Sequence, residues 1–210
     1  MATLKNGILG PASGSVANVI FSSRNGKPYV RSRPARVANP QTPKQEASRM
    51  LMKLLSPMLS TFKPFIRAGF TNIPMGKSAR DVAYSTNGRG VLKGEYPDIE
   101  IDYPLVKVSD GPLEPAGEAS MELSGQTLSF SWNPASQTIK PHANHDIAMV
   151  LAYNCELGSV VYSLRAAERR AGICELDLTS EMAGDPQNLH GWISFVSSDG
   201  KMASESRYVL

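Results

Sequence analysis

The chain of 210 residues is 41% apolar, so it is long enough to bury a core, and its composition excludes disorder throughout. The longest apolar runs, about five residues, are far shorter than the roughly 20 that a membrane-spanning helix needs, and we expect no membrane span. The net charge of +3 conceals unlike halves, because residues 1–93 carry fifteen Lys and Arg against two acids, whereas residues 94–210 carry seven against seventeen. Halves of +13 and −10 indicate that the basic half meets a polyanion, or an acidic surface of this chain or of a neighbouring copy.

A β-hairpin is predicted near the N-terminus. Residues 15–22 and 28–32 read as strands on either side of Asn25-Gly26, the dipeptide that best tolerates the positive φ angles of a type I′ turn. The second strand continues as RSRPARVANPQTP, in which the prolines cannot donate ladder hydrogen bonds and favour an extended, solvent-facing arm. The residues of the hairpin and arm that we expect to contact a partner or a polyanion are Arg24, Lys27, Tyr29, Arg31, Arg33 and Arg36.

One or two helices follow the arm. Thr42 is typical of an N-cap, since Pro43 suits the first helical position and Gln45 can complete a capping box. Pro57 is expected to kink or split this helix, and a second, short helix is predicted from residue 78 to about 87. The apolar positions that recur at helical spacing in the first helix are Ala47, Leu51, Leu54, Met58 and Phe62.

From residue 96 the sequence changes to seven or eight short alternating segments separated by turn signals. This pattern predicts an antiparallel β-sandwich of immunoglobulin or fibronectin type III style, with Trp132 and Trp192 in its core. The fold class expected for the whole chain is therefore α+β. Its predicted domains are residues 1–95, with the basic hairpin, arm and helices, and residues 96–210, with the sandwich.

Three patterns resemble sites of known chemistry, and each lacks an essential part. The segment TNIPMGKS at residues 71–78 is close to a phosphate-binding loop, but it has no first glycine and no buried strand before it. His142, His145, Asp146 and the two cysteines are possible metal ligands, yet no C-x-x-C pair or rigid element brings them together. No nucleophile elbow is present. We expect no enzymatic activity, no cofactor, no metal and no small-molecule substrate.

Other polar residues read as ordinary surface. Glu175 and Asp177 alternate along a strand and share one face, which suits a half-exposed strand. Arg169 and Arg170, with Arg165 and Glu168 before them, are typical of a solvated turn or a helical bulge. Cys155 and Cys174 are expected to fill space in strands, and the opening MATLKNG shows no Sec signal peptide. We therefore expect a cytoplasmic protein, or part of a particle assembled in the cytoplasm.

A set of short motifs spans nearly the whole chain: Gly10, Ser13-Gly14, Gly26-x-x-Tyr29-x-Arg31-x-x-Pro34, Asn39-Pro40-x-Thr42-x-x-Gln45, Gly69-Phe70, Gly94-Glu95-Tyr96-Pro97, Ile101-Asp102, Ser109-x-Gly111, Tyr153-Asn154, Arg169 and Ser204-x-Ser206-x-Tyr208. In these residues the chain resembles an uncharacterised family of about 200-residue proteins common in Bacteroidota, and this resemblance implies no activity. The arm, with the pattern R-x-x-P followed by N-P-x-T-x-x-Q, is more weakly similar to phage structural proteins, which implies an assembly role by analogy.

These features predict a non-enzymatic structural subunit that forms a homo-oligomer with copies of itself, as a filament, tube or shell. A basic patch that meets a different, acidic patch on the next copy generates a head-to-tail contact that repeats. The alternative is a nucleic-acid-binding protein that uses the basic N-terminal half. A small enzyme or carbohydrate-binding sandwich comes third, because paired acids and aromatic platforms are missing.

Overall fold

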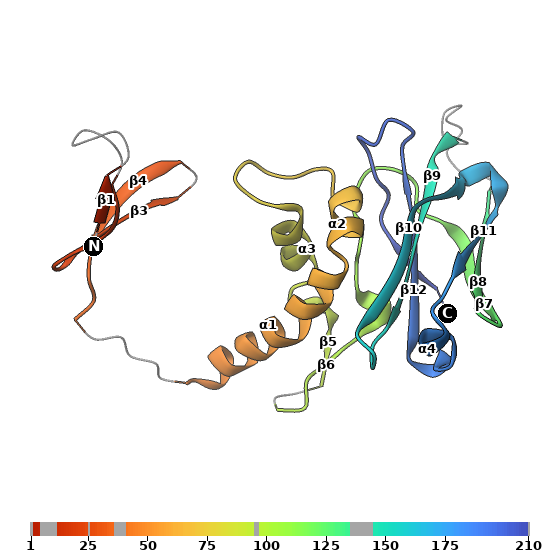
Figure 1. The fold of residues 1–210 in the computed structure, drawn as a ribbon, viewed down its shortest axis with the longest axis horizontal. Coiled ribbons are helices and arrows are strands. Elements are labelled where there is room, and N and C mark those ends of the chain that lie inside the picture. The colour runs from red at the N-terminus through yellow and green to blue at the C-terminus, as the bar shows by residue number, and fades with distance from the viewer. Residues whose placement is uncertain are drawn as a thin grey trace. The chain divides into compact units, whose positions relative to one another are not determined.

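The computed structural model describes residues 2–4, 12–24, 26–35, 41–94, 97–134 and 145–209 (Figure 1). These residues form four α-helices and thirteen strands, and the strands pair in antiparallel sheets. The expected α+β class is therefore confirmed. The chain divides into two compact units, Met1–Thr42 and Pro43–Leu210.

The N-terminal unit is a four-stranded antiparallel sheet in which each strand pairs with the next along the chain. The predicted hairpin is present as its last two strands, with Gly26 at a φ of 77°; Asn25 lies outside the described residues. The strand expected over residues 15–22 is interrupted by a turn at Ala17 and Asn18, so that Val16 pairs with Val19. The four strands are β1 (Ala2–Leu4), β2 (Ala12–Val16), β3 (Val19–Arg24) and β4 (Lys27–Ser32).

Three helices open the second unit: α1 (Pro43–Thr61), α2 (Lys63–Gly69) and α3 (Ala79–Asn87). The first begins at Pro43 as predicted, and Pro57 lies inside it rather than ending it. The third is capped by Ser78, whose hydroxyl accepts a hydrogen bond from the backbone N–H of Asp81, while the Asp81 carboxylate accepts one from the backbone N–H of Ser78. Among the described residues, no helix is long and apolar enough to cross a membrane.

Two larger sheets follow, with strand orders β10-β9-β12-β13 and β11-β8-β7. A short pair, β5 and β6, precedes them, and a short helix, α4, lies between β11 and β12. The bounds of these elements are β5 (Leu92–Lys93), β6 (Glu100–Ile101), β7 (Gly117–Ser124), β8 (Thr127–Asn133), β9 (Ile147–Asn154), β10 (Ser159–Glu168), β11 (Ile173–Asp177), α4 (Ser180–Ala183), β12 (Leu189–Val196) and β13 (Arg207–Val209).

The second unit has three layers, namely the helices, the four-stranded sheet and the three-stranded sheet (Figure 1). The middle sheet is covered on both faces, which is why β9 reads as the nearly continuous apolar run IAMVLAYN. Its alternate residues belong to two cores: Met149 and Leu151 pack in the core with the helices, and Ala148 and Val150 in the core between the sheets.

The two tryptophans lie in different cores. Trp132 packs between the two sheets, edge-on to Phe195. Trp192 packs against the helices beside Phe62, and its Nε1 donates a hydrogen bond to the carbonyl of Val106 at 2.9 Å. Both tryptophans were predicted to lie in the core of the sandwich, and this was wrong for Trp192. The face of β12 that carries Trp192 points toward the helices and away from the three-stranded sheet.

The boundary predicted between residues 95 and 96 follows the change in composition and charge, and it stays a prediction about domain organisation. Packing divides the chain elsewhere, between Thr42 and Pro43. The apolar stripe of α1, with Leu55 and Leu59 fully buried, needs cover and shares one core with β9 and β12. The helices and the two sheets therefore form one packed unit.

The burial of Cys174 in the core between the sheets can be tested through the reactivity of its thiol. Burial, helped by the charge of neighbouring Glu175, raises the pKa of its thiol to about 11. A rise of this size from the ordinary value leaves about 100-fold less thiolate near pH 8, and thiolate is the reactive form. Iodoacetamide should therefore label Cys174 at least about 100-fold more slowly in the native protein than in urea, measured by peptide mass spectrometry. Equal rates in the two conditions would contradict the placement, and Cys174→Ser identifies the signal.

Candidate interaction surface

The register of β3 and β4 places most of the predicted contact residues on one face of the N-terminal sheet. Arg24 is paired directly with Lys27, and Tyr29 and Arg31 follow Lys27 at steps of two residues. Paired residues share a face, and so do residues two apart along a strand. We call the surface formed by Arg24, Lys27, Tyr29 and Arg31 the basic face.

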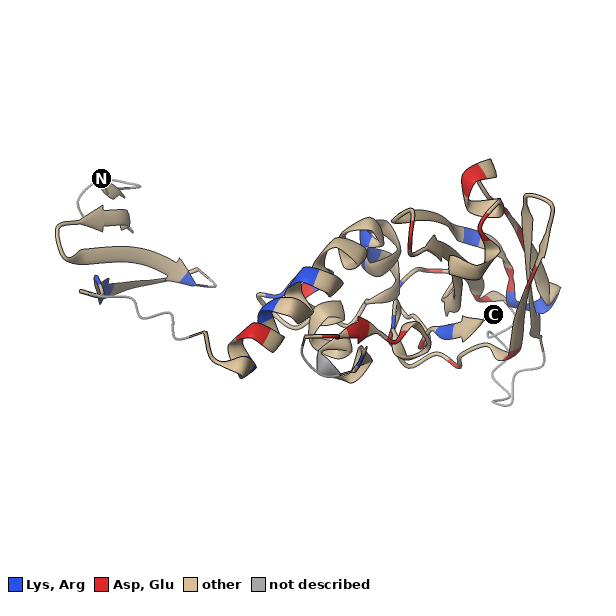
Figure 2. Cartoon of the chain, turned by 90° about the horizontal axis from the view of Figure 1, so that it is seen from below, with Lys and Arg blue, Asp and Glu red and all other residues tan. Residues whose placement is uncertain are grey.

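The basic face lacks any carboxylate side chain in its own unit. Residues 1–42 contain six Lys and Arg and neither Asp nor Glu, and in Figure 2 this sheet carries blue segments, which mark Lys and Arg, and no red ones. Arg24 and Lys27 lie directly opposite each other, an arrangement of like charges that destabilises a strand pair. Tyr29, between the cations, is 44% exposed. An anionic partner would relieve this repulsion.

The remaining two predicted contact residues follow β4. Arg33 is exposed, and its backbone N–H donates a hydrogen bond to the carbonyl of Asn18 at 2.7 Å, which ties the start of the arm to the turn between β2 and β3. Arg36 lies outside the described residues, together with the rest of the arm up to Pro40. The structure thus brings four of the six predicted contact residues together on one face. Arg33 follows directly after β4.

The opposite face of the same sheet is apolar. Val16 is paired with Val19, and Phe21 with Val30, so these four side chains share it; we call them the apolar face. The three valines are 54%, 37% and 60% exposed, in the order Val16, Val19 and Val30. Every residue of the N-terminal unit whose burial is described is at least partly exposed. Sequence reasoning missed this face, although the alternation in VIFSSR and KPYVRS could have revealed it.

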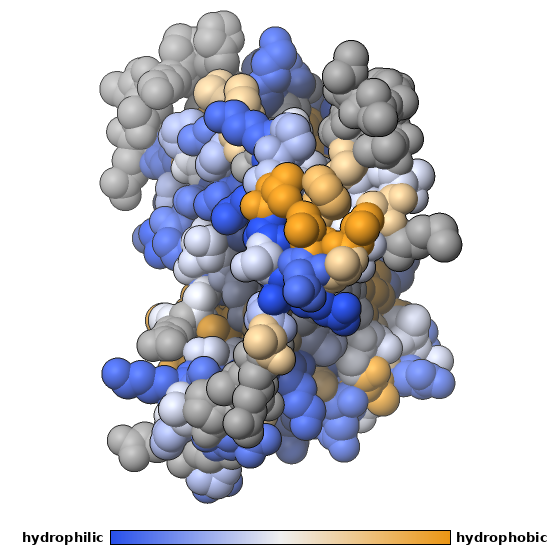
Figure 3. All heavy atoms as spheres, turned by 90° about the vertical axis from the view of Figure 1, so that its left-hand side faces the viewer, coloured by the Kyte–Doolittle hydropathy of each residue, from blue (hydrophilic) through white to orange (hydrophobic). Residues whose placement is uncertain are grey.

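Figure 3 shows strongly hydrophobic side chains gathered into a patch with hydrophilic ones around it. A sheet with one uncovered apolar face does not obtain the burial that stabilises a folded sheet, and exposed apolar patches bordered by polar residues mark interaction surfaces. The N-terminal unit therefore has the character of a docking element, with a charged face and an apolar face.

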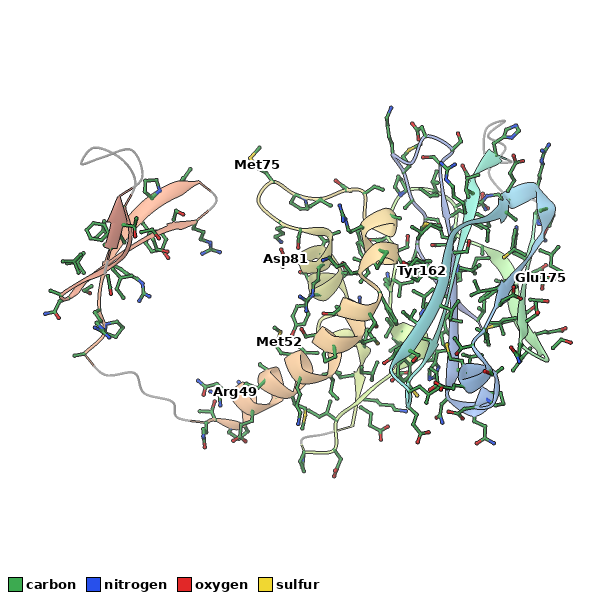
Figure 4. All side chains as sticks on the ribbon, viewed as in Figure 1. Arg49, Met52, Met75, Asp81, Tyr162 and Glu175 are labelled. Carbon is green, nitrogen blue, oxygen red and sulfur yellow. The ribbon has the colours of Figure 1, made fainter. Side chains whose placement is uncertain are left out.

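The phosphate-loop-like segment has another role. Ser78 and Asp81 use their side chains to cap α3, so a carboxylate already occupies the helix N-terminus where a phosphate would bind. The loop before α3 is exposed, and Met75 in it is fully exposed. Figure 4 labels Met75 on this loop and Asp81 on α3. This geometry does not build a phosphate nest.

The possible metal ligands are not brought together. Cys174 packs between the sheets, whereas Cys155 packs at the edge of the core with the helices, where its thiol lies 3.8 Å from the amide oxygen of Asn188. His145 lies 3.7 Å from the carboxylate of Glu168. His142 is outside the described residues. Within the described part of the chain, no group of three or more His, Cys, Asp or Glu could hold a metal ion.

Arg169 is a buried residue, and its interpretation as part of a solvated turn was wrong. It is 2% exposed, and one guanidinium nitrogen lies 2.6 Å from the carbonyl of Glu114 and 3.4 Å from the carboxylate of Asp146. The guanidinium carbon lies 3.7 Å from the ring centroid of Phe195. Burial lowers the pKa of Arg169 and raises that of Asp146, although each opposite charge acts against the shift. Its role is structural.

A cluster of aromatic and titratable side chains lies at the edge of the core with the helices. The ring of His190 stacks on Tyr103 at 3.9 Å, and its Nδ1 lies 2.9 Å from the hydroxyl of Tyr208. Burial lowers the pKa of His190 and raises the pKa values of Tyr103 and Tyr208. These groups satisfy one another, so the cluster reads as packing rather than as a reactive site.

The fold and its surfaces define a mixed α+β protein with an N-terminal sheet that presents a basic face and an apolar face. The chain belongs to the family of unknown function DUF6266, whose model matches residues 11–210. This match confirms the expected membership of an uncharacterised family. No curated protein and no solved structure matches the chain.

Proposed function

We propose that this protein is a non-enzymatic structural subunit that self-assembles through its N-terminal sheet and arm into a filament, tube or shell. The assembly would form in the cytoplasm and be comparable to those of phage structural proteins. The observation that carries the proposal is the apolar face, which no described side chain of the N-terminal unit covers. A second copy of the chain supplies the cover in an assembly.

The energetics favour burial of this face. Fully burying one Val or Phe side chain stabilises by roughly 1.5–3 kcal/mol, so the four side chains of the apolar face together contribute several kcal/mol. β4 also forms one edge of the sheet and offers unpaired backbone groups for strand addition by a neighbour. Burial of apolar side chains would stabilise the contact between copies, and backbone hydrogen bonds to β4 would fix the orientation of the neighbouring strand.

We also propose that the two larger sheets form a sandwich of immunoglobulin or fibronectin type III style. Its support is the strand order. With β7 to β13 read as strands A, B, C, C′, E, F and G, the two sheets have the orders A-B-E and C′-C-F-G. Such sandwiches serve as rigid modules in many extracellular and particle proteins, which suits a subunit without an active site.

The assembly proposal predicts the effect of changing the apolar face. Phe21→Ser with Val30→Ser removes two apolar side chains that pair across β3 and β4, and should weaken association by about 100-fold. Multi-angle light scattering and negative-stain images of the full-length protein measure this. The matched control is Ile73→Ser with Leu157→Ser, which removes two exposed apolar side chains of the second unit and should leave assembly nearly unchanged. A wild-type protein that stays monomeric in both measurements would contradict the proposal.

Nucleic-acid binding is the second candidate, and Tyr29 favours it, because its exposed ring lies between Lys27 and Arg31 on one face. In that case log affinity for a single strand or duplex should fall linearly with log salt, by about 0.7–0.9 per phosphate contacted. The ratio of absorbance at 260 and 280 nm, for protein purified without nuclease, gives the first answer. Particles that dissolve on nuclease treatment would favour this candidate over self-assembly.

A further inference from the structure

We infer that the basic face of one copy docks on the outer face of the β11-β8-β7 sheet of a second copy. This inference rests on the proposed self-assembly and names the two surfaces that meet. The outer face carries the carboxylates of Glu118, Glu122, Glu175 and Asp177, and we call these four residues the acidic face.

The register of the three-stranded sheet assembles the acidic face. Glu122 on β7 and Glu175 on β11 are both paired with Ser129 on β8, so the three lie in one row across the sheet. Asp177 is paired with Thr127 in the next row. The alternate residues of these strands point inward, and the exposed ones therefore share the outer face, where Figure 4 shows Glu175.

Glu118 joins the same face through an irregularity of β7. The pairing of β7 with β8 shifts between Gly117 and Ser120, and Glu118 has a φ of 48° there. Its carboxylate accepts a hydrogen bond from the side-chain amide of Asn133, an exposed residue at the end of β8, at 3.2 Å. Backbone in this sparsely populated conformation holds a fourth carboxylate on the outer face.

The acidic face has no cation of its own. Strands β7, β8 and β11 contain no Lys, Arg or His, and none of the four carboxylates pairs with a basic side chain among the described residues. Asp177 accepts a hydrogen bond from the neutral hydroxyl of Thr127, at 3.1 Å. Four like charges on a flat sheet repel one another, and a basic partner would lower that repulsion.

The two faces are opposite in charge and similar in extent. Lys27 and Arg31 are four residues apart on β4, which is about 13 Å along a strand, and Glu118 and Glu122 are separated by a similar length of β7. Glu122 and Glu175 are two strands apart, about 10 Å, a span that the long side chains of Lys and Arg can reach. Between the carboxylates the outer face carries the short side chains of Ser120, Ser129 and Ser131, and it also carries Ile173, which is 54% exposed.

The occupant is a second copy because both surfaces belong to one chain and are different from each other. A contact between unlike surfaces of identical subunits is heterologous, and it repeats from copy to copy until it closes a ring or continues as a filament. The apolar face lies on the other side of the N-terminal sheet, so it stays available for a different contact in the same assembly.

Charge reversal on each face, followed by mixing, tests the inference. One full-length variant carries Glu122→Lys and Glu175→Lys, and the other carries Arg24→Glu and Arg31→Glu. At low salt each should associate at least about tenfold more weakly than wild type, since like charges then face each other. An equimolar mixture should recover association to within about threefold of wild type, because each variant then offers the surface that the other needs.

The matched control is Asp98→Lys with Asp110→Lys, which changes the net charge equally at exposed residues outside the β11-β8-β7 sheet and should leave association within about threefold of wild type. Circular dichroism confirms that each variant folds, and nuclease-treated samples are compared by sedimentation velocity. If wild type assembles and the reversals have no effect, or if mixing restores nothing, the inference is overturned and self-assembly stands. Equal weakening by the control also overturns it. If wild type stays monomeric, the proposed function itself fails.

Discussion

Deletion of residues 1–42 should leave a folded monomer. All the buried residues of both cores lie between Leu51 and Val209, so the second unit keeps its packing when the N-terminal sheet is removed. The basic and apolar faces, by contrast, disappear completely. Light scattering should report a single subunit mass at concentrations where the full chain assembles, and the melting temperature should stay within about 3 °C of the full-length value, which corresponds to roughly 1 kcal/mol of stability.

A shorter deletion provides the matched control. Removal of residues 1–10 takes away β1 and leaves β2, β3 and β4, which carry both faces. This variant should therefore keep assembling. An oligomer of unchanged mass after deletion of residues 1–42 would show that the contacts lie in the second unit, and a truncated protein that does not fold would show that the N-terminal sheet is part of its core.

Local patterns of the sequence predict several elements well. The helix expected from residue 78 is present because Ser78 and Asp81 form a capping box and the apolar residues repeat at helical spacing. The alternating segments after residue 96 are strands for a similar reason, since half of their side chains point into a core. Signals of this kind act over a few residues, and a single sequence carries them directly.

The layers depend on contacts between distant residues, and the sequence alone does not reveal them. Trp132 and Trp192 are equally apolar, yet they face opposite sides of the middle sheet, which only the pairing of the strands determines. The predicted strand over residues 15–22 includes only the last two residues of β2, and no strand is predicted over β1. One sign of the third layer was present: β9 is apolar at successive positions, as in a strand covered on both faces.

The candidate surface was predicted in part. The basic residues of the hairpin stand out by charge, and the register of β3 and β4 places three of them, Arg24, Lys27 and Arg31, on one face with Tyr29. The acidic face needed more information, because Glu122 and Glu175 are far apart in sequence and meet only through their common neighbour Ser129. Arg169 was misread for the opposite reason. Its partner Asp146 lies 23 residues away, and nothing local distinguishes it from the exposed Arg170 beside it.

Replacement of Arg169 by alanine should strongly destabilise the second unit. The change leaves the carboxylate of Asp146 buried without its partner, removes a hydrogen bond to the carbonyl of Glu114, and removes the contact with the ring of Phe195. Removing one member of a buried ion pair costs about 3–5 kcal/mol. Urea denaturation followed by tryptophan fluorescence measures it, since the Trp132 indole donates a hydrogen bond to the carbonyl of Arg169 at 2.7 Å.

Arg170→Ala is the matched control, because Arg170 is the next residue and its side chain is 65% exposed beside Glu168. Its loss should change stability by no more than about 0.5 kcal/mol, the usual range for a surface site. A double-mutant cycle with Asp146→Ala separates the ion pair from the packing: the double variant should be more stable than the sum of the single losses predicts, by about 1–3 kcal/mol. Strictly additive losses would mean that Arg169 stabilises the unit through Phe195 and the carbonyl of Glu114, and that its charge pairing with Asp146 only offsets the cost of burial.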